Sequence, residues 1–308
     1  MKHGLLLIDK PSGMTSHDVV QKVRRILNQK SVGHIGTLDP LASGLLGVVL
    51  GEATKLAQWL QVADKTYLAD IKLGETTTTL DSDGDVVESK AVEVSRERVE
   101  EQVSQLNGDF DWPIPFFSAK KVGGEELYKK AYRGEAVPDL PLKKMSFFDV
   151  SLREYEKPHV QVKLSCEKGG FIRTWADQMG KALGVGAHLT GLRRLRVGRF
   201  EISQACDLKD LEEGRFEPAF FGFSELVRDW KTVRVNSKEE KLMENGQVPF
   251  DLQARLIPEQ KEVLRSGQEQ GVRVCNSEGQ LRALLMIRPG QGIKILRVFK
   301  LDPDAFSH

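Results

Sequence analysis

The residues best suited to chemistry lie in a glycine-rich stretch, residues 33–51. It holds five glycines and a single acid, Asp39, with His34 a few positions earlier. Pro40 fixes its own φ and biases Asp39 towards an extended conformation, so the carboxylate lies on a stiff loop. The apolar run 45–50 predicts a buried strand that anchors this loop. An ionised aspartate on a fixed loop can act as a nucleophile, although the same residue types are equally typical of a structural turn.

Two further side chains could take part in such chemistry, Tyr67 and Arg173. Alternating apolar residues predict a strand over 67–73 that begins with Tyr67. Arg173 follows Gly169 and Gly170 in the first turn of a predicted helix. The positive end of the helix dipole disfavours a cation there, so Arg173 needs either a partner carboxylate or solvent. The sequence leaves these two environments open.

Hydrophobic periodicity predicts the other elements that position these residues. A buried strand is expected over 4–8, and another strand over 160–166. Helices are expected after Ser16, which would be the N-cap, and over 52–60 and 95–106. Strands and helices thus mix along the chain.

Composition limits the class of protein. The chain has 308 residues, enough for one large domain and a small one, and 40% of them are hydrophobic. A formal net charge of +1 excludes a globally basic nucleic-acid binder but permits a local basic face. Cys166, Cys206 and Cys275 show neither zinc-site nor disulfide spacing. The apolar run 5–8 is too short for a signal peptide or a membrane span, so we expect a cytoplasmic protein.

Aromatic residues and cations are interleaved in the segment 111–141. Flanked by Gly-Gly and Pro, such a mixture suits a mobile insertion that grips a polyanion. An amphipathic helix packed on the body of the protein fits the same spacing. The candidate RNA-binding cations of this segment are Lys120, Lys121, Lys129 and Lys130.

A second cationic stretch, 178–200, contains five cations and no acid. Its candidate RNA-binding residues are Arg193, Arg194 and Arg196. A stretch with cations and no acids, in a chain of nearly zero net charge, indicates a local site for binding phosphates. The alternative is an edge strand whose arginines prevent pairing with other chains.

Beyond Asp229 the composition changes to short apolar runs broken by Gly, Asn and Pro. This pattern predicts a small all-β, barrel-like domain.

Several motifs together resemble the TruB family, the bacterial tRNA pseudouridine-55 synthases. The run Gly-His-Ile-Gly-Thr-Leu-Asp-Pro-Leu-Ala-Ser-Gly at 33–44 is similar to the family's catalytic motif, with Ile35 in place of the usual threonine. Phe117 stands where the family more often has tyrosine. The likeness covers about two thirds of the chain and continues, in the family's order, through 10–16, 65–67, 74–84, 168–174, 186–189 and 192–195.

The resemblance implies an α+β fold in two domains. Residues 1–229 would form a pseudouridine synthase catalytic domain around a bisected mixed and antiparallel sheet. A thumb insertion at about 112–141 would clamp the tRNA arm. Residues 230–308 would form a β-barrel-like, PUA-type RNA-binding domain.

The resemblance also implies roles for the site residues. Asp39 is the catalytic nucleophile, and Arg173 pairs with Asp39 and fixes its direction. Tyr67 stacks on the uracil and is a candidate base for the later proton removal. His34 fills the stack that the everted uridine leaves, and the backbone of Leu192 contacts the flipped base.

The activity implied is isomerisation of uridine 55 in the T-arm stem-loop of tRNA to pseudouridine. The reaction involves neither redox change nor external group transfer, so we expect no cofactor and no metal. We expect a monomer whose partner is tRNA. Two alternatives stay open: a guide-dependent relative that modifies ribosomal RNA, and an RNA chaperone that binds tRNA.

Overall fold

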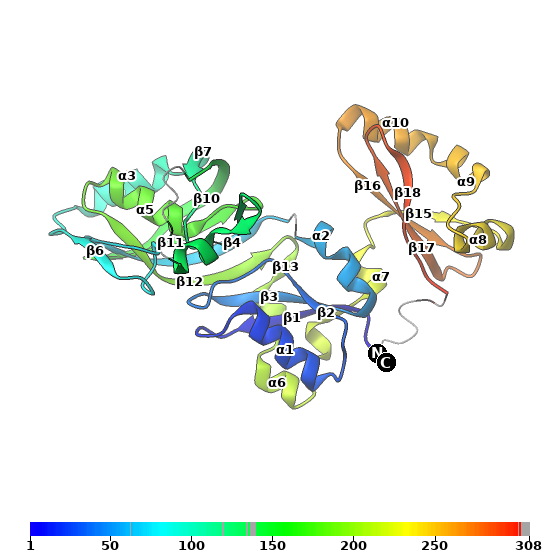
Figure 1. Ribbon diagram of the computed structural model, residues 1–308, viewed down its shortest axis with the longest axis horizontal. Helices are drawn as coiled ribbons and strands as arrows, with labels where there is room; N and C mark the ends of the chain where they lie inside the picture. The colour runs from blue at the N-terminus through cyan, green and yellow to red at the C-terminus, as the bar shows by residue number, and fades with distance from the viewer. Residues whose placement is uncertain (62, 119, 134, 136–139, 301, 303–308) are drawn as a thin grey trace.

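The computed structural model describes residues 1–61, 63–118, 120–133, 135, 140–300 and 302. They form a sheet of ten strands and, at the C-terminal side, a separate sheet of four, each with its own helices (Figure 1). None of the helices in this part of the chain is long and apolar enough to cross a membrane. The mixed α+β class predicted from the sequence is confirmed.

The large sheet has the strand order β14-β1-β3-β12-β4-β11-β10-β7, with β2 paired to β3 and β13 paired to β12. Its strands are β1 (Gly4–Lys10), β2 (Val32–Ile35), β3 (Ser43–Leu50), β4 (Lys65–Leu73), β7 (Gly108–Pro113), β10 (Leu142–Glu156), β11 (His159–Cys166), β12 (Ala187–Val197), β13 (Phe200–Glu201) and β14 (Phe220–Gly222).

A short parallel contact between β3 and β12 divides this sheet into two halves. It joins Arg193 to Ser43 and Arg194 to Gly44, while the neighbouring pairs β1–β3 and β12–β4 are antiparallel. Gly44 has φ +99°, and a Cβ atom there would lie 2.3 Å from the carbonyl oxygen of Arg194. A glycine is therefore required where the two halves meet. This is the bisected sheet that the sequence predicted.

Helices pack on both halves of the large sheet (Figure 1). α1 (Ser16–Ile26) packs on β2, α3 (Arg96–Gln105) packs on β10, and α5 (Ile172–Ala182) packs on β12 and β4. The predicted helix over 52–60 is a 3-10 turn, η1 (Gly51–Leu56), followed by α2 (Ala57–Leu60). Shorter elements are η2 (Ile202–Gln204), α6 (Leu208–Glu212), η3 (Glu217–Ala219) and α7 (Phe223–Leu226).

Two small ribbons project from this body. β5 (Glu75–Thr77) pairs with β6 (Val86–Ser89), and β8 (Lys121–Val122) pairs with β9 (Glu125–Glu126). The second ribbon continues into α4 (Leu127–Tyr132) and lies between β7 and β10 in the chain, where the thumb insertion was expected. Residues 119, 134 and 136–139 of that insertion lie outside the described residues.

The C-terminal sheet has the order β15-β16-β17-β18. Its strands are β15 (Lys231–Arg234), β16 (Gln270–Cys275), β17 (Leu281–Arg288) and β18 (Gly292–Val298), and its helices are α8 (Ser237–Glu244), α9 (Phe250–Arg255) and α10 (Ile257–Ser266). The sequence predicted strands alone here, so the three helices correct that prediction. Helices with exposed apolar residues, such as Phe250 and Leu264, lack the clean periodicity that would have indicated them.

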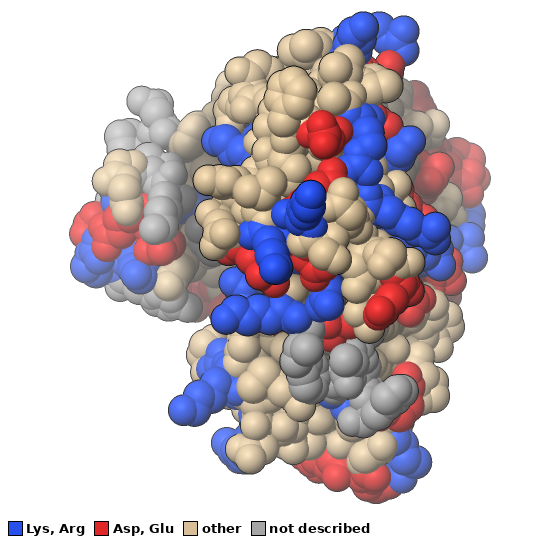
Figure 2. All heavy atoms as spheres, turned by 90° about the vertical axis from the view of Figure 1, so that its right-hand side faces the viewer, with Lys and Arg blue, Asp and Glu red and all other residues tan. Residues whose placement is uncertain are grey.

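Charges of both signs cover the C-terminal side of the molecule. Figure 2 shows Lys and Arg side chains gathered across the middle of this face, with Asp and Glu side chains among and around them. This face therefore carries charges of both signs.

Candidate active site

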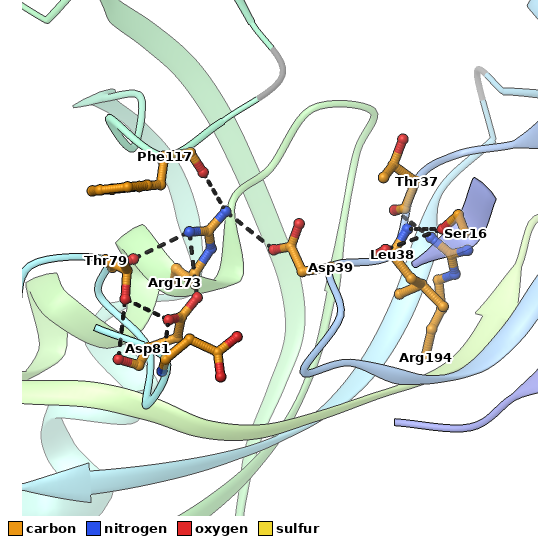
Figure 3. A network of polar contacts seen from close by, with 10 residues as sticks. Ser16, Thr37, Leu38, Asp39, Thr79, Asp81, Phe117, Arg173 and Arg194 are labelled. Atoms are coloured by element: carbon orange, nitrogen blue, oxygen red, sulfur yellow. Dashed lines mark hydrogen bonds and ion pairs between the residues drawn. The ribbon is translucent and has the colours of Figure 1, made fainter. Parts of the chain in front are cut away.

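The loop 36–42, between β2 and β3, carries Asp39 and is held in place by Ser16 (Figure 3). The N–H of Leu38 donates to Ser16 Oγ at 2.8 Å, and Ser16 Oγ donates to the carbonyl of Leu38 at 3.0 Å. Ser16 is 2% exposed. The sequence predicted Ser16 as the N-cap of α1. This is wrong, because Thr15 caps the helix. Ser16 instead fixes the loop from the first turn of α1.

Arg194 supports the same loop from inside the core. The side chain is fully buried, and its Nε donates to the carbonyl of Leu45 at 2.7 Å. Its Nη1 and Nη2 donate to the carbonyls of Thr37 at 3.2 Å and Gly36 at 3.1 Å. The guanidinium is directed at these backbone carbonyls, and Arg194 also lines the same cavity as Asp39, so its predicted RNA contact stays a prediction. Arg194 stiffens the loop that carries Asp39.

The carboxylate of Asp39 lies against Arg173, at the start of α5 (Figure 3). Arg173 Nη2 is 3.1 Å from Asp39 Oδ2, and Arg173 Nη1 is 3.4 Å from Asp81 Oδ2. The Asp39 side chain is 45% exposed, whereas those of Arg173 and Asp81 are 9% and 6% exposed. An arginine in the first helical turn thus has the carboxylate partners that its position requires. Of the two, only Asp39 is accessible to a substrate.

Backbone carbonyls complete the surroundings of Arg173. Its Nη1 donates to the carbonyl of Thr79 at 3.1 Å, and its Nη2 donates to the carbonyl of Phe117 at 2.8 Å (Figure 3). Phe117 precedes the thumb ribbon. The guanidinium therefore joins the Asp39 loop, the segment after β5 and the base of the thumb.

Asp81 is the residue of this network that the sequence left without a role. Thr79 Oγ1 and the N–H of Asp83 both donate to Asp81 Oδ1, the latter at 3.2 Å. These bonds hold the carboxylate towards Arg173. The sequence indicated only a polar, turn-rich segment here, and the contact with Arg173 joins residues too far apart in the chain for a local pattern to reveal.

Tyr67 lies near the start of β4 and lines the same cavity as Asp39 and Arg173. The cavity has a volume of about 470 Å³ and is also lined by Leu192 of β12. Tyr67 is 7% exposed, and burial raises the pKa of its phenol to about 12, against the opposing effect of Arg194. The phenol is therefore neutral at physiological pH, and its ring forms one wall of the cavity.

Arg193 and Arg196 face away from this cavity. On β12, Arg194 pairs directly with Tyr67 of β4, whereas Arg193 and Arg196 pair with the two residues that flank Tyr67. Successive residues of a strand point to opposite faces. Arg193 forms an ion pair with Asp9 at 2.6 Å, and Arg196 Nε donates to a threonine hydroxyl of β4 at 3.1 Å. The structure does not bring these predicted RNA contacts to the site.

The four thumb lysines have different surroundings. Lys120 is exposed and lines the cavity. Lys129 forms an ion pair with Glu126 at 3.0 Å, and Lys130 is half-buried on α4. Lys121 belongs to β8, and its side chain lies outside the described ones. Of these residues, the structure places Lys120 nearest the catalytic candidates.

His34 lies in β2, just before the loop, and is not among the residues that line the cavity. Burial, and next the Arg194 guanidinium, lower the pKa of its imidazole. Its Nδ1 is buried without a hydrogen-bond partner among the described residues. His34 is thus a neutral ring beside the site.

Lys10 is a buried cation beneath the loop. It is 0% exposed, and its Nζ donates to the carbonyls of Pro11 at 2.9 Å and Met14 at 2.6 Å. Burial lowers the pKa of Lys10 to about 8, although the nearby Asp39 carboxylate opposes this shift. Lys10 supports the turn before α1 and adds positive charge behind Asp39.

Neither the cysteines nor the acids suggest a metal centre. Cys166, Cys206 and Cys275 are free and buried. Within the described ranges, no group of His, Cys, Asp and Glu side chains is arranged to hold a metal ion. The chemistry that this cavity offers is that of a carboxylate, a guanidinium and an aromatic ring.

Comparison with solved structures defines the class of fold. The chain is similar to a protein chain in the crystal structure of a Cbf5-Nop10-Gar1 complex, with a TM-score of 0.67 and 23% identity over 97% of this chain and 85% of that one. A Nop10-Cbf5 complex from the archaeal box H/ACA particle gives a TM-score of 0.65 and 22% identity over 97% and 86%. The chain therefore has the same fold as these two proteins.

Sequence comparison defines the family. Residues 24–172 match the model of the TruB family pseudouridylate synthase N-terminal domain, and residues 173–217 match that of the tRNA pseudouridylate synthase B C-terminal domain. The chain is 39% identical to tRNA pseudouridine synthase B of Bdellovibrio bacteriovorus over 97% of both chains. It is 36% identical to the protein of that name from Vibrio parahaemolyticus, over 91% of this chain and 86% of that one. The chain belongs to the TruB family of pseudouridylate synthases.

Proposed function

We propose that this chain converts one uridine of tRNA, uridine 55 in the T-arm, into pseudouridine, with Asp39 as the nucleophile. The observation that carries the proposal is the contact of an accessible Asp39 carboxylate with a buried Arg173 guanidinium, 3.1 Å apart, in a cavity whose wall is Tyr67. The relatives named tRNA pseudouridine synthase B support tRNA as the substrate.

The reaction breaks the bond between uracil N1 and ribose C1′ and joins C1′ to uracil C5. The proton on C5 is lost and N1 gains one, so uridine and pseudouridine are isomers. Asp39 bonds covalently to the sugar or to the base in between, and Arg173 directs its carboxylate and stabilises its charge. The Arg194 and Ser16 bonds to the loop hold Asp39 still, which favours attack in one geometry.

The target uridine must leave its stack to reach this cavity. Tyr67 stacks on the everted base, and the backbone of Leu192 contacts the base edge from β12. His34 takes the place that the base vacates, and its neutral imidazole suits a stack of nucleobases. The high pKa of Tyr67 keeps its phenol protonated at neutral pH, so little phenolate is present to act as a base and stacking is its main role.

The proposal also assigns a role to each of the two parts of the chain. Residues 1–229 act as the catalytic domain, and residues 230–308, with the mixed charges of Figure 2, act as a PUA-type RNA-binding domain. The thumb around 112–141 grips the tRNA arm with Lys120, Lys121, Lys129 and Lys130. A tRNA substrate also implies a cytoplasmic enzyme, and we expect it to work as a monomer.

The test uses the purified chain with an unmodified tRNA transcript and no guide RNA or partner protein. Nucleoside chromatography and site mapping should find pseudouridine at position 55 and none in a transcript with cytidine there. Dependence on an added guide RNA would favour the guide-dependent alternative. Tight binding without turnover would favour the RNA chaperone. Either result would refute the proposal.

A further inference from the structure

One corner of the cavity contains a buried hydroxyl, that of Ser118. The residue is 5% exposed, and its Oγ has no hydrogen-bond partner among the described residues. Its backbone is fixed, because its N–H donates to the carbonyl of Phe116 at 3.0 Å and its carbonyl accepts from the N–H of Tyr128 at 3.0 Å. A buried unsatisfied hydroxyl costs free energy unless a ligand or water bonds to it. Ser118 lines the cavity with Asp39.

The N-terminus of α5 opens on the same corner. Its N-cap is Phe171, and no side chain caps it. The N–H of Trp175 donates to the carbonyl of Phe171 at 3.0 Å, and this hydrogen bond closes the first full turn of the helix. The preceding N–H groups, including that of Ile172, have no intrahelical acceptor. Gly169, with φ +90°, makes the turn that brings these donors to the cavity.

The charge of this corner is positive, and Arg173 does not supply it. The Arg173 guanidinium is occupied by two carboxylates and two carbonyls. Lys120 and Lys168 are exposed, line the cavity and have no ion-pair partner in the part of the chain that the structure describes. Asp39 is the one acid among the described residues lining the cavity. Two exposed ammonium groups thus lack a counter-ion among the described residues here, while the buried Lys65 of the same cavity donates to the carbonyls of Gln61 and Ala63.

These groups select the chemistry of the ligand. Free N–H groups, a hydroxyl and two ammonium groups offer donors and positive charge. Uracil is neutral, so the two ammonium groups do not favour it over an anion. A phosphate offers only acceptors and negative charge, and it suits a helix N-terminus.

We propose that Ser118, the N-terminus of α5 and Lys168, assisted by Lys120, form a subsite for a phosphate next to the everted uridine. This inference rests on the proposed function, because the phosphate belongs to the RNA strand that the enzyme binds. The subsite holds the strand at its backbone while the base enters the cavity. Ser118 is a positioning residue and does not touch the reacting atoms.

The test neutralises the phosphates of the substrate one at a time. A T-arm stem-loop is made with a methylphosphonate on the 5′ or the 3′ side of the target uridine, and KM and kcat are measured for both and for the unmodified RNA. The variants are Ser118→Ala and Lys168→Gln, with Lys209→Gln on α6, an exposed lysine outside the cavity, as the control.

We expect one of the two neutral linkages to raise the KM of the wild type about tenfold, with kcat nearly unchanged. Ser118→Ala and Lys168→Gln should each raise KM for the unmodified RNA and lose most of their sensitivity to that linkage. Lys209→Gln should behave as the wild type. Urea unfolding should show Ser118→Ala to be at least as stable as the wild type, because the hydroxyl has no partner to lose among the described residues and its burial costs free energy.

Two outcomes would overturn the subsite. One is a wild type insensitive to both neutral linkages, and the other is full sensitivity retained in both variants. If Ser118→Ala loses activity equally on charged and neutral RNA, its hydroxyl acts on the base or the sugar, which also overturns the proposal. Failure of the wild type to convert the unmodified RNA would instead refute the proposed function, so the two failures are distinguishable.

Discussion

The buried carboxylate of Asp81 lies 3.4 Å from the Arg173 guanidinium, at the Nη1 group, while Nη2 is directed at Asp39. Asp81 therefore determines where the charge next to Asp39 lies. In Asp81→Asn the side chain keeps its shape but loses its charge. We expect kcat to fall about ten- to a hundredfold with KM little changed, because the ion pair that positions Arg173 is lost. Single-turnover kinetics on unmodified tRNA measure this.

The control for that variant is Asp83→Asn, an exposed neighbour whose backbone N–H, and not its side chain, bonds to Asp81. It should leave kcat unchanged. An Asp81→Asn enzyme with wild-type kcat would show that Arg173 does not depend on Asp81.

Arg194 provides a second prediction, which separates loop support from RNA contact. Arg194→Lys cannot reach the three carbonyls that the guanidinium bonds, so the free energy of unfolding should fall by about 2–4 kcal/mol. The salt dependence of tRNA binding should stay the same, because no phosphate contact is lost. Lys168→Gln should do the reverse, with unchanged stability and a shallower salt slope. If the tRNA affinity of Arg194→Lys depends less steeply on salt than that of the wild type, Arg194 does contact RNA.

Gly44 tests the junction between the two halves of the sheet. Gly44→Ala places a Cβ atom 2.3 Å from the carbonyl oxygen of Arg194, and its φ is +99°. We expect a loss of at least about 3 kcal/mol in unfolding free energy, from overpacking and backbone strain together. Gly214→Ala has a similar φ of +76° but nothing within 4 Å of its Cβ, so it should lose only about 1 kcal/mol. Urea unfolding of both variants checks this, and equal losses would contradict it.

Lys10 predicts a specific dependence of stability on pH. Burial lowers its pKa to about 8 in the folded chain, from 10.5 for an ordinary lysine. Between these values the unfolded state binds more protons than the folded state, so the stability contribution of this group rises with pH. Relative to Lys10→Met, the wild type should gain about 1–2 kcal/mol in unfolding free energy from pH 8 to pH 9.5. Below pH 7 the difference should be constant. A difference that is flat throughout would show that the amine is not buried as a cation.

The local part of the site could be predicted from the sequence. Glycines and Pro40 indicate a stiff loop for conformational reasons alone, and the buried strand behind it is confirmed as β3. The position of Arg173 at a helix start left a carboxylate partner or solvent open, and the structure provides the carboxylates of Asp39 and Asp81.

The long-range part could not be predicted. Asp81 contacts Arg173, and Ser118 lines the cavity, only because elements distant in the chain come together, and nothing in their sequence neighbours indicates it. The run of arginines on β12 predicts one cationic surface, but a strand directs successive side chains to opposite faces. Arg194 thus enters the core while Arg193 faces away. Only the register of β12 with β4 reveals this separation.

The central claim is that the carboxylate of Asp39 performs the reaction, and Asp39→Asn tests it most directly. The change keeps the size of the side chain and removes its charge, while the loop keeps its bonds to Ser16 and Arg194. Single-turnover conversion of unmodified tRNA is measured together with tRNA affinity and urea unfolding. The account predicts a folded variant that binds tRNA and forms no pseudouridine above background. A folded variant that forms pseudouridine at a rate close to that of the wild type would contradict it.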